Sequence, residues 1–502
     1  MRGAWAAKIG WAICAVLLIA YAAFGALLLS PWAASWDEVD FVLALDRFDL
    51  LAMQPHAPGY PYFVLGGQLI RSFIEDPVKA LGGWNLLLAC TSAFAVYRIG
   101  RRWLTIPYAC LAAAIVLTVP MNWTLAVRPM SDGAALAILW WYLWSLVRLA
   151  EKRSSGRWLV AAFLFGLLMG TRLSYVPFGI GLLIIWAGVW RDARLSVRAK
   201  AARLTGWAAA VSAFQFLWVF AVGAAEGSLA ETLRLFAGFG EGHFTEWGGG
   251  VAQPGLPLGE RIWRFAADNW LWTGLFARSA WLAAAAGLLL AWTVWAAYRR
   301  KPSNRLSVGR LRRFAVSPAG ILIVCAIAYA LWALLGQNIA KTRHIAPLAA
   351  MSIFALAVCA GRLKAAKPVT AVLLTVLALV QTAEGARLVV LQHKEEPAVY
   401  QLADASAQDV SPSTVLYTWE EERVLRYLNV PVETRPIFTY SYFLANIEAE
   451  RNARILLTGS VWEEFRKQAD LPDTKVRRLG AFQSDDRLDP VYGKIELYEW
   501  IR

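Results

Sequence analysis

The sequence predicts an α-helical, multi-pass membrane protein with a small α/β domain at its C-terminal end. Of its 502 residues, 58% are hydrophobic and only 17% are charged, whereas a soluble domain is nearer half apolar and a quarter charged. The apolar residues gather in runs of about twenty, the length that a helix needs to cross roughly 30 Å of hydrocarbon. These observations exclude a soluble enzyme, a nucleic-acid-binding module and a disordered protein.

The apolar runs predict about eleven transmembrane helices. They are expected near residues 9–30, 81–100, 104–125, 131–149, 158–171, 175–190, 206–225, 277–298, 318–336, 345–361 and 368–391. The first run has the basic start of a signal peptide, but its length of about 22 residues favours an uncleaved helix. All five cysteines lie within these spans, so neither a disulfide framework nor a Cys-based zinc site is expected.

The distribution of the net charge of +14 predicts the orientation of the chain. Basic residues gather in alternate loops, with five in 191–203 and seven in 299–313, and the loops on that side contain only two acids, Glu151 and Asp192. Lys and Arg hold such loops in the cytoplasm. We therefore expect a plasma or inner membrane protein with a cytoplasmic N-terminus, an external C-terminal domain and no nucleic-acid partner.

Three external segments are large. Residues 31–80 should form an amphipathic helix, a turn at Gln54-Pro55-His56-Ala57-Pro58-Gly59 and a second amphipathic helix in the membrane interface. Residues 226–276 contain Gly248-Gly249-Gly250 and Gln253-Pro254-Gly255, which favour a mobile loop.

The third external segment, 392–502, has the composition of a soluble protein and should form a domain separate from the membrane domain, 1–391. Short β-rich runs alternate in it with helical ones, a pattern typical of a small α/β domain. The strands are expected at Thr414–Thr418, Arg454–Thr458 and Lys494–Trp500, and the helices at 420–428 and 461–468.

Common soluble catalytic motifs are missing, among them the Walker A loop, the dinucleotide fingerprint, His-Glu-x-x-His and the nucleophile elbow. The acids at the outer ends of the spans remain as candidate catalytic residues. Asp37 and Glu38, beside interfacial Trp residues, are either a solvated helix start or a carboxylate poised as a general base. Asp132 either caps the fourth span or forms an anion site or ion pair with Arg128.

Basic residues are unusual on the outer side, so those found there need a reason. Arg172 occupies a tight turn, and Lys341, Arg343 and His344 precede the tenth span. They either reach lipid headgroups or bind a lipid-linked phosphate, while His56 between two prolines is equally explained as a turn residue. Because nucleotide-activated donors are not generally available outside the cell, an enzyme there must take its activated group from a lipid carrier or from the acceptor.

These motifs resemble the GT-C superfamily of integral membrane glycosyltransferases, in particular the branch with protein O-mannosyltransferases and the bacterial aminoarabinose transferase of lipid A. The first span leads into Trp36-Asp37-Glu38, similar to the family's acidic motif. Gln54-Pro55-His56-Ala57-Pro58 is similar to its His-Pro-Pro stretch, with Ala57 at the first Pro position. Arg128-Pro129-Met130-Ser131-Asp132 and Arg343-His344 complete the resemblance, which covers about 390 residues.

The resemblance implies transfer of a sugar from a polyprenyl-phosphate carrier to a glycan, lipid or protein acceptor on the outer face, usually with inversion. Asp37 would be the general base, Glu38 its neighbour and Asp132 a second acid. The substrate-binding residues would be His56, Arg128, Arg172, Lys341, Arg343 and His344. The lipid-linked sugar is then a co-substrate, membrane lipids are partners, and whether a divalent metal assists the carboxylates is left open.

Two other functions compete with this one. A transporter or flippase for lipid-linked sugars would use the same charges to guide a headgroup. Transporters, however, place polar or broken helices near the midplane, whereas the predicted spans carry their charges mostly at the ends. An envelope polysaccharide polymerase or ligase would share the compartment and use a polymeric donor.

Overall fold

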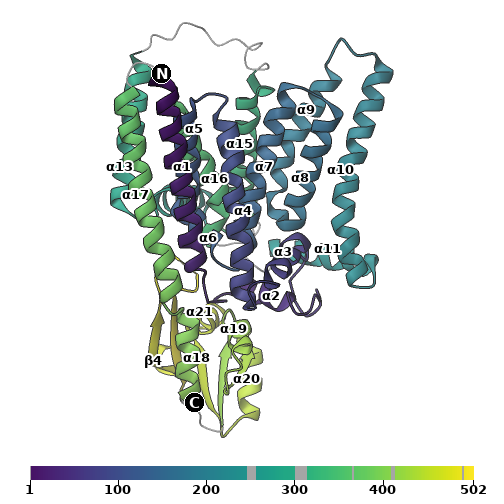
Figure 1. Ribbon diagram of the computed structural model, residues 1–502. Helices are drawn as coiled ribbons and strands as arrows, with labels where there is room; N and C mark the ends of the chain where they lie inside the picture. The colour runs from purple at the N-terminus through teal and green to yellow at the C-terminus, as the bar shows by residue number, and fades with distance from the viewer. Residues whose placement is uncertain (1, 246–255, 300–313, 364–366, 409–412, 489–490) are drawn as a thin grey trace. The chain divides into compact units, whose positions relative to one another are not determined.

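The computed structural model describes residues 2–245, 256–299, 314–363, 367–408, 413–488 and 491–502. The chain divides into two compact units (Figure 1). The membrane unit comprises Met1–Ser30 and Ala44–Val390, and the tail unit comprises Pro31–Leu43 and Leu391–Arg502. The tail unit therefore combines the C-terminal domain with a short segment that follows the first predicted span.

Among the described residues, ten of the eleven predicted spans each match one apolar helical segment, and the span at 104–125 matches a bent pair of helices. Eight helical segments among the described residues are long and apolar enough to cross a membrane, and a bent pair would make a ninth. The predicted spans at 9–30 and 158–171 match two shorter apolar helices, Ala15–Leu27 and Ser155–Thr171. The elements that begin in the membrane unit are α1 (Arg2–Leu27), α3 (Pro61–Arg71), α4 (Pro77–Gly100), α5 (Ile106–Leu117), α6 (Pro120–Ala126), α7 (Ser131–Glu151), α8 (Ser155–Thr171), η1 (Leu173–Gly179), α9 (Ile180–Trp190), α10 (Val197–Ala225), α11 (Leu229–Thr245), α12 (Leu258–Trp263), the π-helical η2 (Arg264–Leu275), α13 (Ala280–Tyr298), α15 (Pro318–Gly336), η3 (Thr342–Ile345), α16 (Ala346–Gly361) and α17 (Lys367–Lys394).

The third span is broken, so the prediction of one continuous helix over 104–125 is wrong. Helices α5 and α6 meet at an angle of 65°, and Pro120 starts α6 because proline cannot continue the preceding helix. Side chains bind two of the carbonyls at the break, as an apolar membrane interior favours. Asn122 donates to the carbonyl of Val116 at 2.9 Å, and Gln381 of α17 donates to that of Ile115.

Much of the segment predicted as a mobile loop, 226–276, is helical instead. It contains α11, α12 and η2. The two glycine- and proline-rich motifs that favoured a loop lie at 248–255, outside the described residues. On either side of them the sequence has apolar residues at helical spacing, which explains the helices.

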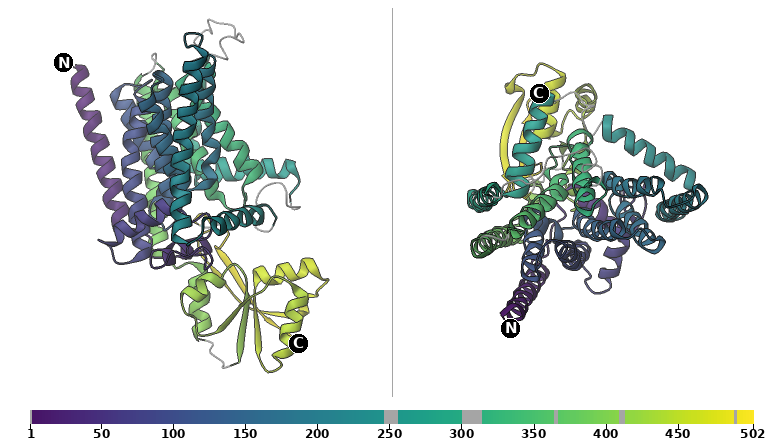
Figure 2. Two further views of the ribbon diagram at one scale, coloured as in Figure 1. Left: turned by 90° about the vertical axis from the view of Figure 1, so that its right-hand side faces the viewer. Right: turned by 90° about the horizontal axis from the view of Figure 1, so that it is seen from above.

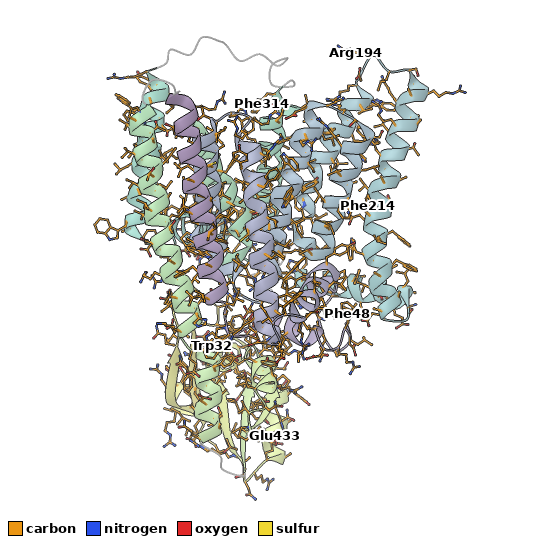
Figure 3. All side chains as sticks on the ribbon, viewed as in Figure 1. Trp32, Phe48, Arg194, Phe214, Phe314 and Glu433 are labelled. Atoms are coloured by element: carbon orange, nitrogen blue, oxygen red, sulfur yellow. The ribbon has the colours of Figure 1, made fainter. Side chains whose placement is uncertain are left out.

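The spans of the membrane unit run side by side (Figure 2). Helix α7 packs against α4, α8 and α15, and its buried Tyr142 shares one apolar core with Phe178 and Tyr329. Figure 3 labels Arg194 and Phe314 at one end of this unit and Phe48 at the other. Arg194, in one basic segment, and Phe314, the residue that follows the other, thus lie at the same end, which also holds the N-terminus in Figure 1.

The tail unit is a five-stranded sheet with flanking helices (Figure 2). The strand order is β2-β1-β3-β5-β4, with β2, β1 and β3 parallel and β5 antiparallel to both β3 and β4. The three predicted strands are confirmed, and two more exist. The elements are α2 (Trp36–Ala44, which ends at the unit boundary), α18 (Ala398–Gln408), β1 (Thr414–Thr418), α19 (Glu422–Tyr427), β2 (Glu433–Pro436), α20 (Tyr440–Ala449), β3 (Arg454–Thr458), α21 (Gly459–Gln468), η5 (Asp473–Lys475), β4 (Val476–Gln483) and β5 (Lys494–Trp500).

Candidate functional site

A buried ionic cluster joins three elements of the membrane unit. The Asp132 carboxylate, in the first turn of α7, lies 2.9 Å from Nη1 of Arg172, which directly follows α8. Nε of Arg343, in η3, lies 3.8 Å from the same carboxylate oxygen. Asp132 is fully buried and Arg172 is 6% exposed. Charged groups in such surroundings must pair, so each member of this ionic cluster fixes the others.

Two further polar groups complete the ionic cluster. Arg172 Nη1 donates to Ser131 Oγ at 3.0 Å, and Arg172 Nη2 lies 3.3 Å from Nδ1 of His344. Tyr329 of α15 donates its hydroxyl to the backbone carbonyl of His344 at 2.9 Å. The structure thereby brings four of the nine predicted site residues together: Asp132, Arg172, Arg343 and His344.

Sequence reasoning missed Asn85, which shapes the turn before α7. From α4, its amide nitrogen donates to the carbonyls of Arg128 and Met130 at 2.8 Å each, and its oxygen accepts from the N–H of Ala134 at 2.8 Å. The N-cap position, Met130, has no side-chain cap. Of the two alternatives for Asp132, capping of the fourth span is therefore wrong, because Asn85 accepts from an N–H of the first turn and the Asp132 carboxylate pairs with the arginines.

A glycine makes this arrangement possible. A Cβ on Gly133 would lie 2.4 Å from the carbonyl oxygen of Leu125 and 3.0 Å from Cγ of Asn85. Any larger residue would push α7 away from α6 and α4. Gly133 thus allows the close approach that places Asp132.

Three more missed residues hold the loop before Arg343. Arg261 of α12 donates to the carbonyls of Leu334 and Gln337 at 2.6 Å each. Asn269 of η2 donates to the carbonyl of Ile339 at 2.6 Å, and His243 Nε2 lies 2.8 Å from that of Gly336. Two of these carbonyls belong to the last turn of α15, where a cation also complements the helix dipole, and the other two follow it. No motif in the sequence indicated these contacts.

The remaining predicted residues of the membrane unit lie in other surroundings. His56 is buried, with Nε2 3.1 Å from the Tyr60 hydroxyl and its ring stacked on Phe239 at 5.5 Å. Arg128 is half-buried at the turn that Asn85 organises, and Lys341 is half-buried just before η3. The ion-pair partners of Asp132 are Arg172, which follows α8, and Arg343 in η3.

Asp37 and Glu38 belong to the tail unit, in the first turn of α2. Glu38 is 1% exposed, and its carboxylate accepts a hydrogen bond from the backbone N–H of Ala34 at 2.9 Å. Asp37 is half-buried. Of the two acids, Asp37 is therefore the more exposed, whereas the Glu38 carboxylate binds the backbone of Ala34.

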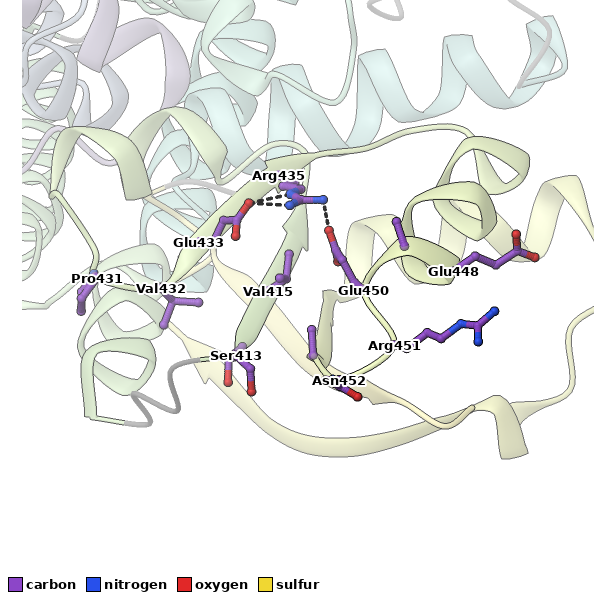
Figure 4. A pocket seen from close by; sticks show the side chains of 13 residues that line it. Ser413, Val415, Pro431, Val432, Glu433, Arg435, Glu448, Glu450, Arg451 and Asn452 are labelled. Carbon is purple, nitrogen blue, oxygen red and sulfur yellow. Dashed lines mark hydrogen bonds and ion pairs between the residues drawn. The ribbon is translucent and has the colours of Figure 1, made fainter.

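A hollow of about 550 Å³ in the tail unit contains none of the predicted site residues (Figure 4). Arg435 forms ion pairs there with Glu433 and Glu450, and Glu450 also accepts from the Tyr417 hydroxyl at 3.1 Å. Burial, followed by the carboxylate of Glu450, raises the pKa of Tyr417 to about 12. Because Arg435 is already paired with two acids of the lining, this hollow is a weaker candidate than the ionic cluster. Within the described parts of the chain, no group of three or more His, Cys, Asp or Glu side chains is placed to hold a metal.

Comparison with known proteins finds one matching family model. Residues 55–220, which carry Asp132 and Arg172, match the family model of dolichyl-phosphate-mannose-protein mannosyltransferases. No curated protein sequence matches the chain.

Two solved structures are similar over most of the chain. ArnT from Cupriavidus metallidurans, bound to undecaprenyl phosphate, is 14% identical over 98% of both chains, with a TM-score of 0.54. The oligosaccharyltransferase AglB from Archaeoglobus fulgidus, in complex with an inhibitory peptide and a dolichol-phosphate, is 13% identical over 88% of this chain and 69% of its own, with a TM-score of 0.50. This chain therefore shares the fold of these two proteins, the fold that the resemblance in its sequence implied.

Proposed function

We propose that this protein is a membrane glycosyltransferase that moves a sugar from a polyprenyl-phosphate carrier to an acceptor on the outer face of the membrane. The observation that carries the proposal is the buried ionic cluster, in which Arg172 and Arg343 converge on Asp132. Guanidinium groups bind phosphate oxygens through paired, charge-assisted hydrogen bonds. The undecaprenyl phosphate in ArnT and the dolichol-phosphate in AglB support a donor of this class.

The chemistry requires charge stabilisation at the leaving group. As the bond between the anomeric carbon and the phosphate oxygen breaks, its electron pair passes to the phosphate. Arg172 and Arg343 would stabilise that charge, with His344 and Lys341 nearby in the chain. Fixed cations of this kind contribute a few kcal/mol to a transition state. Asp132 would hold Arg172 in place, and no acid is needed to protonate a phosphate leaving group.

For the general base we propose Asp37, on the resemblance of Trp36-Asp37-Glu38 to the family's acidic motif. The acceptor hydroxyl oxygen would attack the anomeric carbon from the side opposite the phosphate, with inversion, and its proton would pass to Asp37. The half-buried state of Asp37 supports this choice over Glu38, whose carboxylate accepts from Ala34. Glu38 would then shape the start of α2, and His56 and Arg128 would contact substrate further from the reacting atoms.

The proposed orientation places the N-terminus in the cytoplasm and the tail unit outside. It is supported by the basic loops, which adjoin the end of the membrane unit where Arg194 and Phe314 lie in Figure 3. Lys and Arg near span ends favour the cytoplasmic side.

The broken third span is the one observation that favours a transporter, since transporters use discontinuous helices. Two carbonyls at the break are bound by Asn122 and Gln381, so the break does not offer these two to a passing headgroup. This favours the transferase.

The test uses purified protein in lipid, radiolabelled polyprenyl-phosphate sugars and a membrane extract as acceptor. Wild type should transfer label to the acceptor, and Asp37→Asn should lose a factor of about 10²–10⁴ in rate. Asp46→Asn, which removes an exposed acid of the same loop, is the matched control and should keep wild-type activity. Equilibration of labelled lipid between leaflets without transfer would refute the enzyme and favour the transporter.

A further inference from the structure

The segment that carries Asp37 is held by the C-terminal domain within the tail unit. Asp40 is fully buried, and its Oδ1 accepts a hydrogen bond from Nε of Arg423 at 2.7 Å. The two residues are 383 positions apart in the sequence. A buried carboxylate is costly unless it is paired, so this contact fixes the α2 end of the segment.

A second contact fixes the other end. The N–H of Ala33 donates to the hydroxyl of Tyr400 in α18 at 3.2 Å. The ring of Trp32 packs edge-on against that of Tyr400, with centroids 5.0 Å apart. Asp37 therefore lies between two anchors, one on α18 and one on α19.

The anchor on α19 is itself tied to the sheet. Glu421, which precedes α19, is 4% exposed and accepts hydrogen bonds from Thr418 at 2.6 Å and Thr458 at 3.3 Å. These hydroxyls stand at the carboxyl ends of β1 and β3, two neighbouring parallel strands. Continuous packing thus runs from the central strands through Glu421 and Arg423 to Asp40.

We propose that the C-terminal domain positions the general base, and that Arg423 and Tyr400 are positioning residues for Asp37. This inference rests on the proposed function, because it assigns the domain a part in the same reaction. A misplacement of about 1 Å at a reacting group can cost about 10²-fold in rate. Arg423 would act through Asp40 on the conformation of α2 without touching substrate.

Two measurements on the full-length protein in lipid test the inference. The first is hydrogen exchange of the amides at 31–43, which does not depend on activity. Arg423→Gln should speed that exchange, and Arg423→Lys should restore much of the protection because it keeps the charge. Arg454→Gln is the matched control, since Arg454 pairs with Glu499 across β3 and β5 at 3.2 Å, away from 31–43.

The second measurement is steady-state transfer. Arg423→Gln should lower kcat by about 10- to 100-fold while the KM for a polyprenyl-phosphate sugar changes less than about twofold, and Arg423→Lys should recover part of kcat. Arg454→Gln should leave both constants near wild type. Unchanged exchange at 31–43, or an equal loss of activity in Arg454→Gln, would overturn the inference.

The two proposals fail in distinguishable ways. If wild type transfers no sugar, the proposed function fails, and the catalytic part of this inference fails with it. Faster exchange in Arg423→Gln would still establish the docking of 31–43. If wild type transfers sugar and Arg423→Gln has wild-type kcat, only the positioning role is refuted.

Discussion

Arg172 and Asp132 form an ion pair of 2.9 Å between the end of α8 and the start of α7, almost fully shielded from solvent. Arg343 approaches the same carboxylate from η3. Removing one partner of a buried pair leaves an uncompensated charge. The pair therefore fixes both the packing of three elements and the direction of the guanidinium groups.

Asp132→Asn should destabilise the membrane unit by about 3–5 kcal/mol, because two guanidinium groups would lose their shared carboxylate. Thermal unfolding of the full chain in lipid measures the effect. Asp192→Asn, in the basic segment 191–203, is the control and should have the same Tm as wild type. An unchanged Tm in Asp132→Asn would show that the buried ion pair contributes little.

Arg343→Gln should weaken binding of undecaprenyl phosphate by about 10- to 100-fold, because a hydrogen bond to a charged group is worth about 1.5–3 kcal/mol. The affinity of Arg343→Lys should lie between those of wild type and Arg343→Gln, since lysine keeps the charge but loses the paired donors. Titration of the lipid into protein in nanodiscs measures this. Arg194→Gln, exposed at the opposite end, should bind as wild type does; an equal loss there would point to a general charge effect.

Asn85→Leu should lower the free energy of unfolding by at least about 1–3 kcal/mol, since two carbonyls and one N–H lose their partner in a buried place. It should also weaken undecaprenyl phosphate binding, because the start of α7 would shift. Asn452→Ala, on the exposed surface of the tail unit, should change stability by less than about 0.5 kcal/mol. If Asn85→Leu were destabilised but bound the lipid normally, the turn before α7 would have no part in lipid binding.

Glu421 makes the tail unit sensitive to pH. Burial raises the pKa of its carboxyl above the ordinary value of 4.5, so the folded state binds its proton more tightly than the unfolded state does. This contribution to stability is present below about pH 4.5 and is lost as the pH rises through the raised pKa. Relative to wild type, Glu421→Gln should therefore become more stable as the pH rises, read from exchange of the β1 and β3 amides.

Glu499 provides the opposite control. Hydrogen bonds from Arg477, and then from Arg454, hold the pKa of Glu499 below its ordinary value against the effect of burial. Its stabilisation is present above the unfolded pKa and is lost as the pH falls through the lowered one. Glu499→Gln should thus be less stable than wild type at neutral pH and approach it in acid. Parallel pH profiles for the two variants, each relative to wild type, would contradict at least one of the two assignments.

The sequence predicted strands well where they are central and apolar. The runs Thr414–Thr418 and Arg454–Thr458 are largely buried and were located to the residue. Strands β2 and β4 lie at the two edges of the sheet, with exposed polar residues. An edge strand has a neighbour on one side only and often carries charged residues. Neither β2 nor β4 therefore shows the apolar pattern by which the other strands were predicted.

The site was predicted only in part, for a physical reason. Charges at the outer ends of spans stand out because lipid disfavours them, so Asp132, Arg172 and Arg343 could be singled out. Their pairing depends on which helices pack together, whereas the sequence offered Arg128 as a partner of Asp132, beside helix capping, because Arg128 is close to it in the chain. Asn85 was missed because a lone amide in an apolar run does not indicate the backbone that it binds.

The measurement that tests the central claim most directly follows the phosphate. A polyprenyl-phosphate sugar with label in the phosphate would be incubated with the protein and an acceptor extract, and free polyprenyl phosphate would be measured together with glycosylated acceptor. The proposed function predicts equal amounts of the two products from wild type and neither from Arg172→Gln. Glycosylated acceptor without free polyprenyl phosphate, or equal product from Arg172→Gln, would contradict it.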